Sequence, residues 1–144
     1  PASARSGDGA VMLTASRLTV RAIVVAALVE AGLRAVKLPT LARVLGVGLA
    51  ASAGRPAVSP GVAESARVAR AARFSVALWG RKERRCLREA LVMGHLLRGS
   101  QPVLRLGVAR DARGVAAHAW VEVAGCAVAE DPRVLAQFTP LRAP

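Results

Sequence analysis

The residues best suited to chemistry are a cysteine, a histidine and two neighbouring carboxylates in the second half of the chain. Cys86 follows the mostly basic run 81–85 and opens a segment with helical apolar spacing. A thiol beside cations at a helix N-terminus is favoured as the reactive thiolate. The pattern therefore suggests nucleophilic catalysis by Cys86, while a small buried cysteine beside a solvated basic face is the alternative interpretation.

A histidine that could serve as a base lies in a segment alternating like a β-strand. The more polar face of this predicted strand carries His118, Trp120 and Glu122. The other face carries the apolar residues Ala119, Val121 and Val123. We expect the apolar set to face the core, so that His118 could meet a nucleophile on a packed helix. A surface histidine beside a tryptophan is the alternative.

Two carboxylates, Glu130 and Asp131, end the next predicted strand. If Ala124 and Gly125 are the central residues of a two-residue turn, Asp131 lies opposite His118 on the same face. With a three-residue loop, Glu130 becomes the same-face carboxylate at a diagonal position. Either residue could then orient the imidazole, and a turn start at Asp131 is the alternative interpretation.

The elements that must position these residues begin with helices. Apolar residues spaced by three and four predict a first helix with Ser16 as its N-cap, namely Leu18, Ala22, Val25, Val29 and Leu33. Pro39 marks a break, and a short helix is predicted over 40–47. The stretch 51–61, rich in glycine and proline, is the predicted linker. Helices follow over 62–78, with Val62, Ala66, Ala69 and Phe74 as apolar positions, and over 81–98.

After Pro102 the pattern becomes extended, with strands predicted over 103–108, 115–123 and 126–129. A helix followed by a meander of three strands is the order of an α+β domain. His95, in mid-helix, and Cys126, beside the turn, are interpreted as structural residues with packing roles.

Composition limits the class of protein. With 144 residues, 53% of them apolar, we expect one globular domain with a core. The net charge is +12, and 19 of the 21 cations are arginines, which favours an anionic partner or reflects a biased composition. Aromatic residues make up only 3%, which argues against single-stranded nucleic acid as that partner.

Several other classes find no support in the sequence. Two cysteines forty residues apart do not form a disulfide framework, and a reducing cytoplasm is therefore expected. The apolar stretch 22–33 contains Glu30 and is too short to span a membrane. We find no phosphate-binding loop, dinucleotide fingerprint or zinc-ligand cluster, so no cofactor or metal is expected.

The cysteine is predicted on a helix, the histidine on the strand that follows and the acid on the next strand. This order is that of papain-like and transglutaminase-like enzymes. More specifically, the segments 85–91, 96–98, 106–108 and 117–123 resemble the leader peptidase of lasso-peptide biosynthesis. The resemblance implies an α+β papain/transglutaminase-like core, a catalytic helix followed by a three-stranded antiparallel meander, with an N-terminal helical extension. Residues 61–144 would then be the transglutaminase-like cysteine peptidase domain, 16–60 the N-terminal helical region and 1–15 a disordered leader.

The same resemblance implies a function and partners. Family members cut the leader from a precursor peptide so that a partner cyclase can close the macrolactam, and this chain resembles the form that works with a separate leader-recognition protein. The family's triad is cysteine, histidine and aspartate, with the aspartate twelve residues after the histidine. This chain departs from that pattern, because the position is Glu130 and Asp131 is one residue further. The rival interpretations are a transglutaminase-like acyltransferase using the same triad and a basic, non-catalytic binding module. Neither nucleic acid nor a membrane span is expected.

Overall fold

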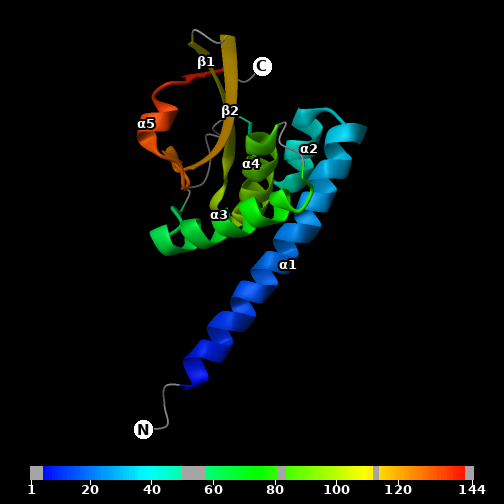
Figure 1. Cartoon of the computed structure of the whole chain (residues 1–144), viewed down its shortest axis with the longest axis vertical. Helices are drawn as coiled ribbons and strands as arrows, with labels where there is room; N and C mark the ends of the chain where they lie inside the picture. Colours follow the sequence, from blue (N-terminus) through cyan, green and yellow to red (C-terminus); the bar gives the residue numbers. More distant parts are fainter. Residues whose placement is uncertain (1–4, 50–57, 81–83, 112–113, 142–144) are drawn as a thin grey trace.

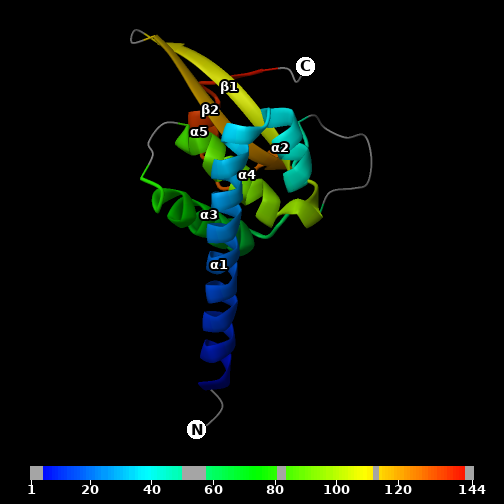
Figure 2. The ribbon, with the colours of Figure 1, turned by 90° about the vertical axis from the view of Figure 1, so that its right-hand side faces the viewer.

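The computed structural model describes residues 5–49, 58–80, 84–111 and 114–141. Its helices are α1 (Arg5–Ala35), α2 (Leu38–Leu45), α3 (Val62–Ala77), α4 (Arg85–Leu96) and α5 (Pro132–Leu135), with the short 3-10 helix η1 (Arg98–Ser100). Its strands are β1 (Val103–Asp111), β2 (Gly114–Val123), β3 (Cys126–Ala127) and β4 (Thr139–Pro140). Helices α1 to α4 gather on one side of the sheet, and the first part of α1 extends away from the rest (Figure 1, Figure 2). The α+β class predicted from the sequence is confirmed.

The apolar stripe predicted for the first helix is buried in α1. Ala22, Val25 and Val29 are at most 5% exposed, and Leu18 and Leu33 pack against the same core. In the part of the chain that the structure describes, no helix combines the length and apolar character needed to cross a membrane.

The start of α1 differs from the prediction. The helix begins at Arg5, so Ser16 lies inside it instead of capping it, and residues 5–15 are helical where we expected a disordered leader. Between Pro1 and Pro39 no proline interrupts the chain, so nothing sterically forces a later start. Residues 1–4 of that predicted leader lie outside the described residues.

Helix α2 starts two residues before the predicted position. Pro39 stands within its first turn instead of breaking the chain before it, because a proline there needs no intrahelical N–H partner. The helix ends at Gly46, whose φ of 73° is the left-handed conformation common at helix ends.

Helix α3 has the predicted extent but a different buried face. Its core residues are Val68, Ala69, Ala71, Ala72, Ser75 and Val76. Val62 and Phe74, expected among the apolar positions, are 89% and 53% exposed. The three arginines of α3 fix this orientation, because their side chains occupy the opposite face and stay in solvent. Residues 51–57 of the predicted linker lie outside the described residues.

Helix α4 is the central helix, since it packs against α1, α3 and β2. The apolar residues spaced by three and four in this segment face the core: Ala90, Leu91, Gly94 and Leu97 are buried, and Leu87 is partly buried. The face is closely packed, because a Cβ added at Gly94 would lie 2.8 Å from a methyl group of Val47.

The sheet is antiparallel with the strand order β3-β2-β1-β4. Strands β1 and β2 form its long hairpin, and β3 continues the predicted meander through a two-residue turn at Ala124 and Gly125. Strand β4, beside β1, and helix α5 had no counterpart in the prediction, because both are too short to show a periodic pattern.

Candidate active site

Cys86 is the second residue of α4 and is half-buried. The chain enters the helix through Arg84, which has a left-handed φ of 53°, and the N–H of Arg88 bonds the Arg84 carbonyl at 3.2 Å. The first N–H groups of a helix have no partner within it. The backbone N–H of Cys86, in the first turn of α4, therefore lies at the positive end of the helix dipole, where an N–H can donate to an oxygen. Of the predicted start, residues 81–83 lie outside the described residues.

A buried ion pair attaches this helix end to α1. Nε of Arg88, two residues after Cys86, donates to Oε2 of Glu30 at 2.6 Å, and Glu30 is only 4% exposed. The other carboxylate oxygen of Glu30 accepts from Arg34 Nη2 at 2.7 Å. The guanidinium groups of Arg88 and Arg34 share the buried carboxylate of Glu30. The contact between Arg88 and Glu30 fixes the position of α4 relative to α1.

His118 lies on β2, directly opposite Gly107 of β1. Its ring stacks on Trp120, with centroids 6.0 Å apart and planes 20° apart, and lies 5.2 Å from the ring of Phe138. The predicted core face is confirmed, since Ala119, Val121 and Val123 are at most 3% exposed, but Trp120 on the opposite face is also buried, at 4%. The ring contacts with Trp120 and Phe138 hold the imidazole in place.

Glu130 is the carboxylate beside the histidine. Its Oε2 lies 3.5 Å from Nε2 of His118, and both side chains are 20% exposed. Among the described residues, the buried Nε2 has no hydrogen-bond partner. At 3.5 Å the contact is longer than a hydrogen bond and is an ion pair when the imidazole carries its proton.

Asp131 lies elsewhere, and the expectation that it faces His118 is corrected. The two-residue turn is confirmed, because Val123 pairs with Cys126. Strand β3 nevertheless ends at Ala127, and Ala129 has a left-handed φ of 55°, so the register cannot be extended to residue 131. The Asp131 carboxylate instead accepts the N–H of Arg133 at 2.8 Å and caps α5.

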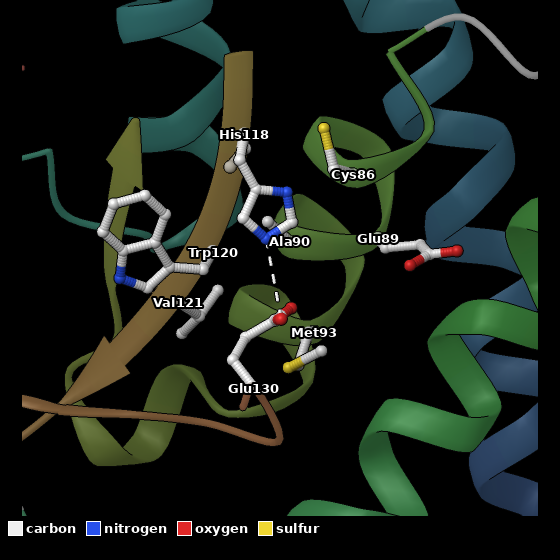
Figure 3. A pocket seen from close by; sticks show the side chains of 9 residues that line it. Cys86, Glu89, Ala90, Met93, His118, Trp120, Val121 and Glu130 are labelled. Atoms are coloured by element: carbon white, nitrogen blue, oxygen red, sulfur yellow. Dashed lines mark ion pairs between the residues drawn. The ribbon is translucent and has the colours of Figure 1, made fainter. Parts of the chain in front are cut away.

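Cysteine, histidine and glutamate line one pocket (Figure 3). The His118 ring lies between the other two, with Nε2 turned to Glu130 and its second nitrogen on the side of Cys86. The lining residues are Cys86, Glu89, Ala90, Met93, His118, Ala119, Trp120, Val121 and Glu130. The arrangement can transfer a proton between a thiol and an imidazole that a carboxylate orients.

Several residues that support the site were given no role there by the sequence. A Cβ at Gly107 would lie 2.9 Å from the Trp120 ring and 3.0 Å from Cβ of Phe138, so this position excludes a side chain. Glu122 accepts from Nε1 of Trp120 at 3.1 Å and from Nε of Arg105 at 2.8 Å. The shared strand face of Trp120 and Glu122 was a usable signal, and Gly107 lies in the segment 106–108 that carries part of the family resemblance. Nothing local pointed to Phe138.

The other histidine and cysteine lie away from the pocket. Nδ1 of His95 is 2.9 Å from the Leu45 carbonyl oxygen and Nε2 is 2.9 Å from Nη1 of Arg98, so His95 connects α4 to α2. Cys126 is exposed on β3 and therefore does not have the packing role that we expected. In the described ranges, no three histidine, cysteine or acidic side chains form a group that could hold a metal ion.

A thiol at a helix start, an imidazole on a strand and a carboxylate after the next strand define a site suited to thiol-dependent acyl transfer in an α+β fold. The chain belongs to the transglutaminase-like superfamily, whose family model matches residues 27–143. This superfamily includes cysteine peptidases and acyltransferases. The match begins within α1 and so includes part of the predicted N-terminal helical region. No curated protein and no solved structure matches the chain.

Proposed function

We propose that this protein is a cysteine peptidase in which Cys86 is the nucleophile, His118 its base and Glu130 the residue that orients the imidazole. The observation that carries the proposal is the single pocket that Cys86, His118 and Glu130 line together, in which Glu130 Oε2 lies 3.5 Å from Nε2 of His118 and the second ring nitrogen is on the side of Cys86. Covalent acyl transfer requires a nucleophile, a base beside it and a group that orients the base.

In the proposed reaction, His118 takes the thiol proton and the Cys86 sulfur attacks the carbonyl carbon of the scissile peptide bond. The oxygen that becomes negative is stabilised by the backbone N–H of Cys86 at the start of α4. The imidazolium returns its proton to the departing amine, which leaves an acyl-thioester on the enzyme. Water, deprotonated by His118, then hydrolyses the thioester and restores the thiol.

The substrate that we propose is the leader–core junction of a lasso-peptide precursor. The support is the resemblance of segments 85–91 and 117–123 to the leader peptidases of that pathway. The partners would be a separate leader-recognition protein, which presents the precursor, and a cyclase that closes the macrolactam. A reducing cytoplasm would keep the nucleophilic thiol free of disulfides.

The alternative is an acyltransferase, because the same three residues would form the same acyl-enzyme and differ only in its acceptor. Incubation of the precursor with the protein and its partners, followed by mass spectrometry, separates the two. Peptidase activity gives a leader fragment with a free carboxylate, and acyl transfer to an amine gives an amide at the same residue.

Two substitutions test the chemistry, and a third serves as a control. Cys86→Ala is expected to abolish cleavage, and His118→Ala to reduce it by at least about 10³-fold. Cys126→Ala removes the exposed thiol and is expected to leave cleavage unchanged. If Cys86→Ala retains the biological activity, the catalytic proposal is overturned in favour of a basic binding module.

A further inference from the structure

The outer face of α3 carries three arginines in a row. Arg67, Arg70 and Arg73 are all exposed, and the residues that α3 buries lie on the opposite side of the helix. A spacing of three residues places successive arginines about 4.5 Å apart along the helix axis. The result is a continuous cationic edge on an otherwise small-residue helix.

Within the described part of the chain, Arg67 and Arg70 form no ion pair, and the single carboxylate of α3 is Glu64 in its first turn. By contrast, Arg34, Arg85, Arg88 and Arg105 each pair with a glutamate of this chain. Among the described residues no carboxylate neutralises Arg67 and Arg70, which leaves their guanidinium groups available to an external anion.

The arginine row ends beside the candidate active site. Nη2 of Arg73 donates to the carbonyl oxygen of Ala129 at 3.2 Å, and Ala129 immediately precedes Glu130 of the pocket. Helix α3 also packs against α4, the helix that carries Cys86. Figure 1 shows α3 crossing beneath α4 and the sheet. A chain leaving the pocket could thus continue over this helix.

Apolar side chains lie among the arginines. Phe74 and Leu78, one helical turn apart, are 53% and 57% exposed, although both are large and apolar. We call the set Arg67, Arg70, Arg73, Phe74 and Leu78 the α3 outer face. It combines cations that bind carboxylates with apolar area that prefers side chains to water.

We infer that the α3 outer face binds an acidic, partly apolar segment of the polypeptide whose acyl bond is processed at Cys86. An extended peptide advances about 3.3 Å per residue, so acidic residues at neighbouring or alternate positions reach successive arginines. Nucleic acid fits less well, since stacking could use only Phe74 in the face and Trp79, which is 44% exposed, next to Leu78. The inference rests on the proposed function, because it assigns the substrate of that same site.

The test compares two synthetic peptides, one alternating glutamate with leucine and one alternating lysine with leucine, each ending in a chloroacetyl group. The Cys86 sulfur displaces chloride to form a thioether, and intact mass spectrometry follows the rate. A Cys126→Ser background leaves Cys86 as the one thiol. Each rate is divided by the rate with iodoacetamide, which corrects for differences in thiol reactivity.

The acidic peptide is expected to label Cys86 at least about tenfold faster than the basic one, and Arg67→Gln with Arg70→Gln to remove most of that advantage. The matched control is Arg17→Gln with Arg21→Gln, which removes two exposed arginines from α1 and is expected to keep the advantage. Equal labelling by both peptides, or equal loss in both double variants, overturns the inference.

Competition experiments test whether the α3 outer face binds another anion instead of the acidic peptide. If a single-stranded DNA oligonucleotide or phosphatidylserine vesicles bind through Arg67 and Arg70 more tightly than the acidic peptide, the face serves another partner and the inference fails. Failure of the proposed function has a different signature. It would show as an iodoacetamide rate at Cys86 that His118→Ala leaves unchanged, whichever peptide is preferred.

Discussion

Gly107 lies directly opposite His118 in the β1–β2 ladder, and the space that a side chain would need there is filled by Trp120 and Phe138. These two aromatic side chains are the ones whose rings contact the imidazole. The absence of a side chain at residue 107 is thus a condition for the position of His118.

Gly107→Ala is therefore expected to displace Trp120 and Phe138 and, with them, the imidazole. We expect a loss of about 1–3 kcal/mol in the free energy of unfolding, as for other overpacked sites. A small displacement of a catalytic group also lowers kcat/KM by at least about tenfold. Denaturant titration and precursor cleavage measure the two effects. Gly99→Ala is the control, since no atom lies within 4 Å of an added Cβ there, and equal effects of both substitutions would contradict the argument.

Substitutions at Glu130 and at Asp131 should have different effects on activity. Glu130→Gln is expected to lower kcat by more than about tenfold but less than the roughly 10⁴-fold seen when the triad aspartate of a serine protease is replaced. The intermediate effect follows from the 3.5 Å separation between Glu130 Oε2 and His118 Nε2. Asp131→Asn should retain activity, because asparagine also caps helices. A larger loss in the Asp131 variant, measured by steady-state cleavage, would reverse the assignment.

The buried carboxylate of Glu30 is expected to stabilise the fold through Arg88. Glu30→Ala leaves the side chain of Arg88, which is only 11% exposed, without this carboxylate and should cost about 3–5 kcal/mol in the free energy of unfolding. Arg34→Ala removes an arginine whose side chain is 57% exposed and should cost less than about 1 kcal/mol. Urea denaturation distinguishes these values.

A double substitution provides the matching control. Glu30→Leu with Arg88→Met removes both charges and should recover much of the stability lost in Glu30→Ala, because no charge is left buried. If the double variant is less stable than Glu30→Ala, the ion pair is not the main cause of the loss.

The two cysteines should respond oppositely to substitution. Cys126 is exposed on β3 and lies outside the pocket, so Cys126→Ser should change stability by less than about 0.5 kcal/mol and leave kcat/KM within about twofold. Cys86→Ser should be nearly inactive, since a serine hydroxyl is far less ionised than a thiol at neutral pH. Thermal unfolding and cleavage assays of both variants check this, and a strong loss of activity in Cys126→Ser would place the reactive thiol elsewhere.

The sequence determined the parts of this protein that depend on local periodicity. The apolar stripe of α1, the buried face of α4 and the alternation of β2 each follow from side-chain spacing, which repeats with the geometry of the helix or strand. The turn was also predictable from Gly125, because glycine readily adopts the left-handed conformation that the turn needs, whereas Ala124 adopts it although alanine rarely does.

Tertiary structure decided which carboxylate faces His118. One left-handed residue, Ala129, ends the register after β3, and a single-residue change reverses every following side chain. The contacts of Phe138 and Gly107 with the site also needed the assembled sheet, since they join residues far apart in the chain. Cys86 and His118 could thus be selected from the sequence, but the third member of the site depends on backbone angles that only packing determines.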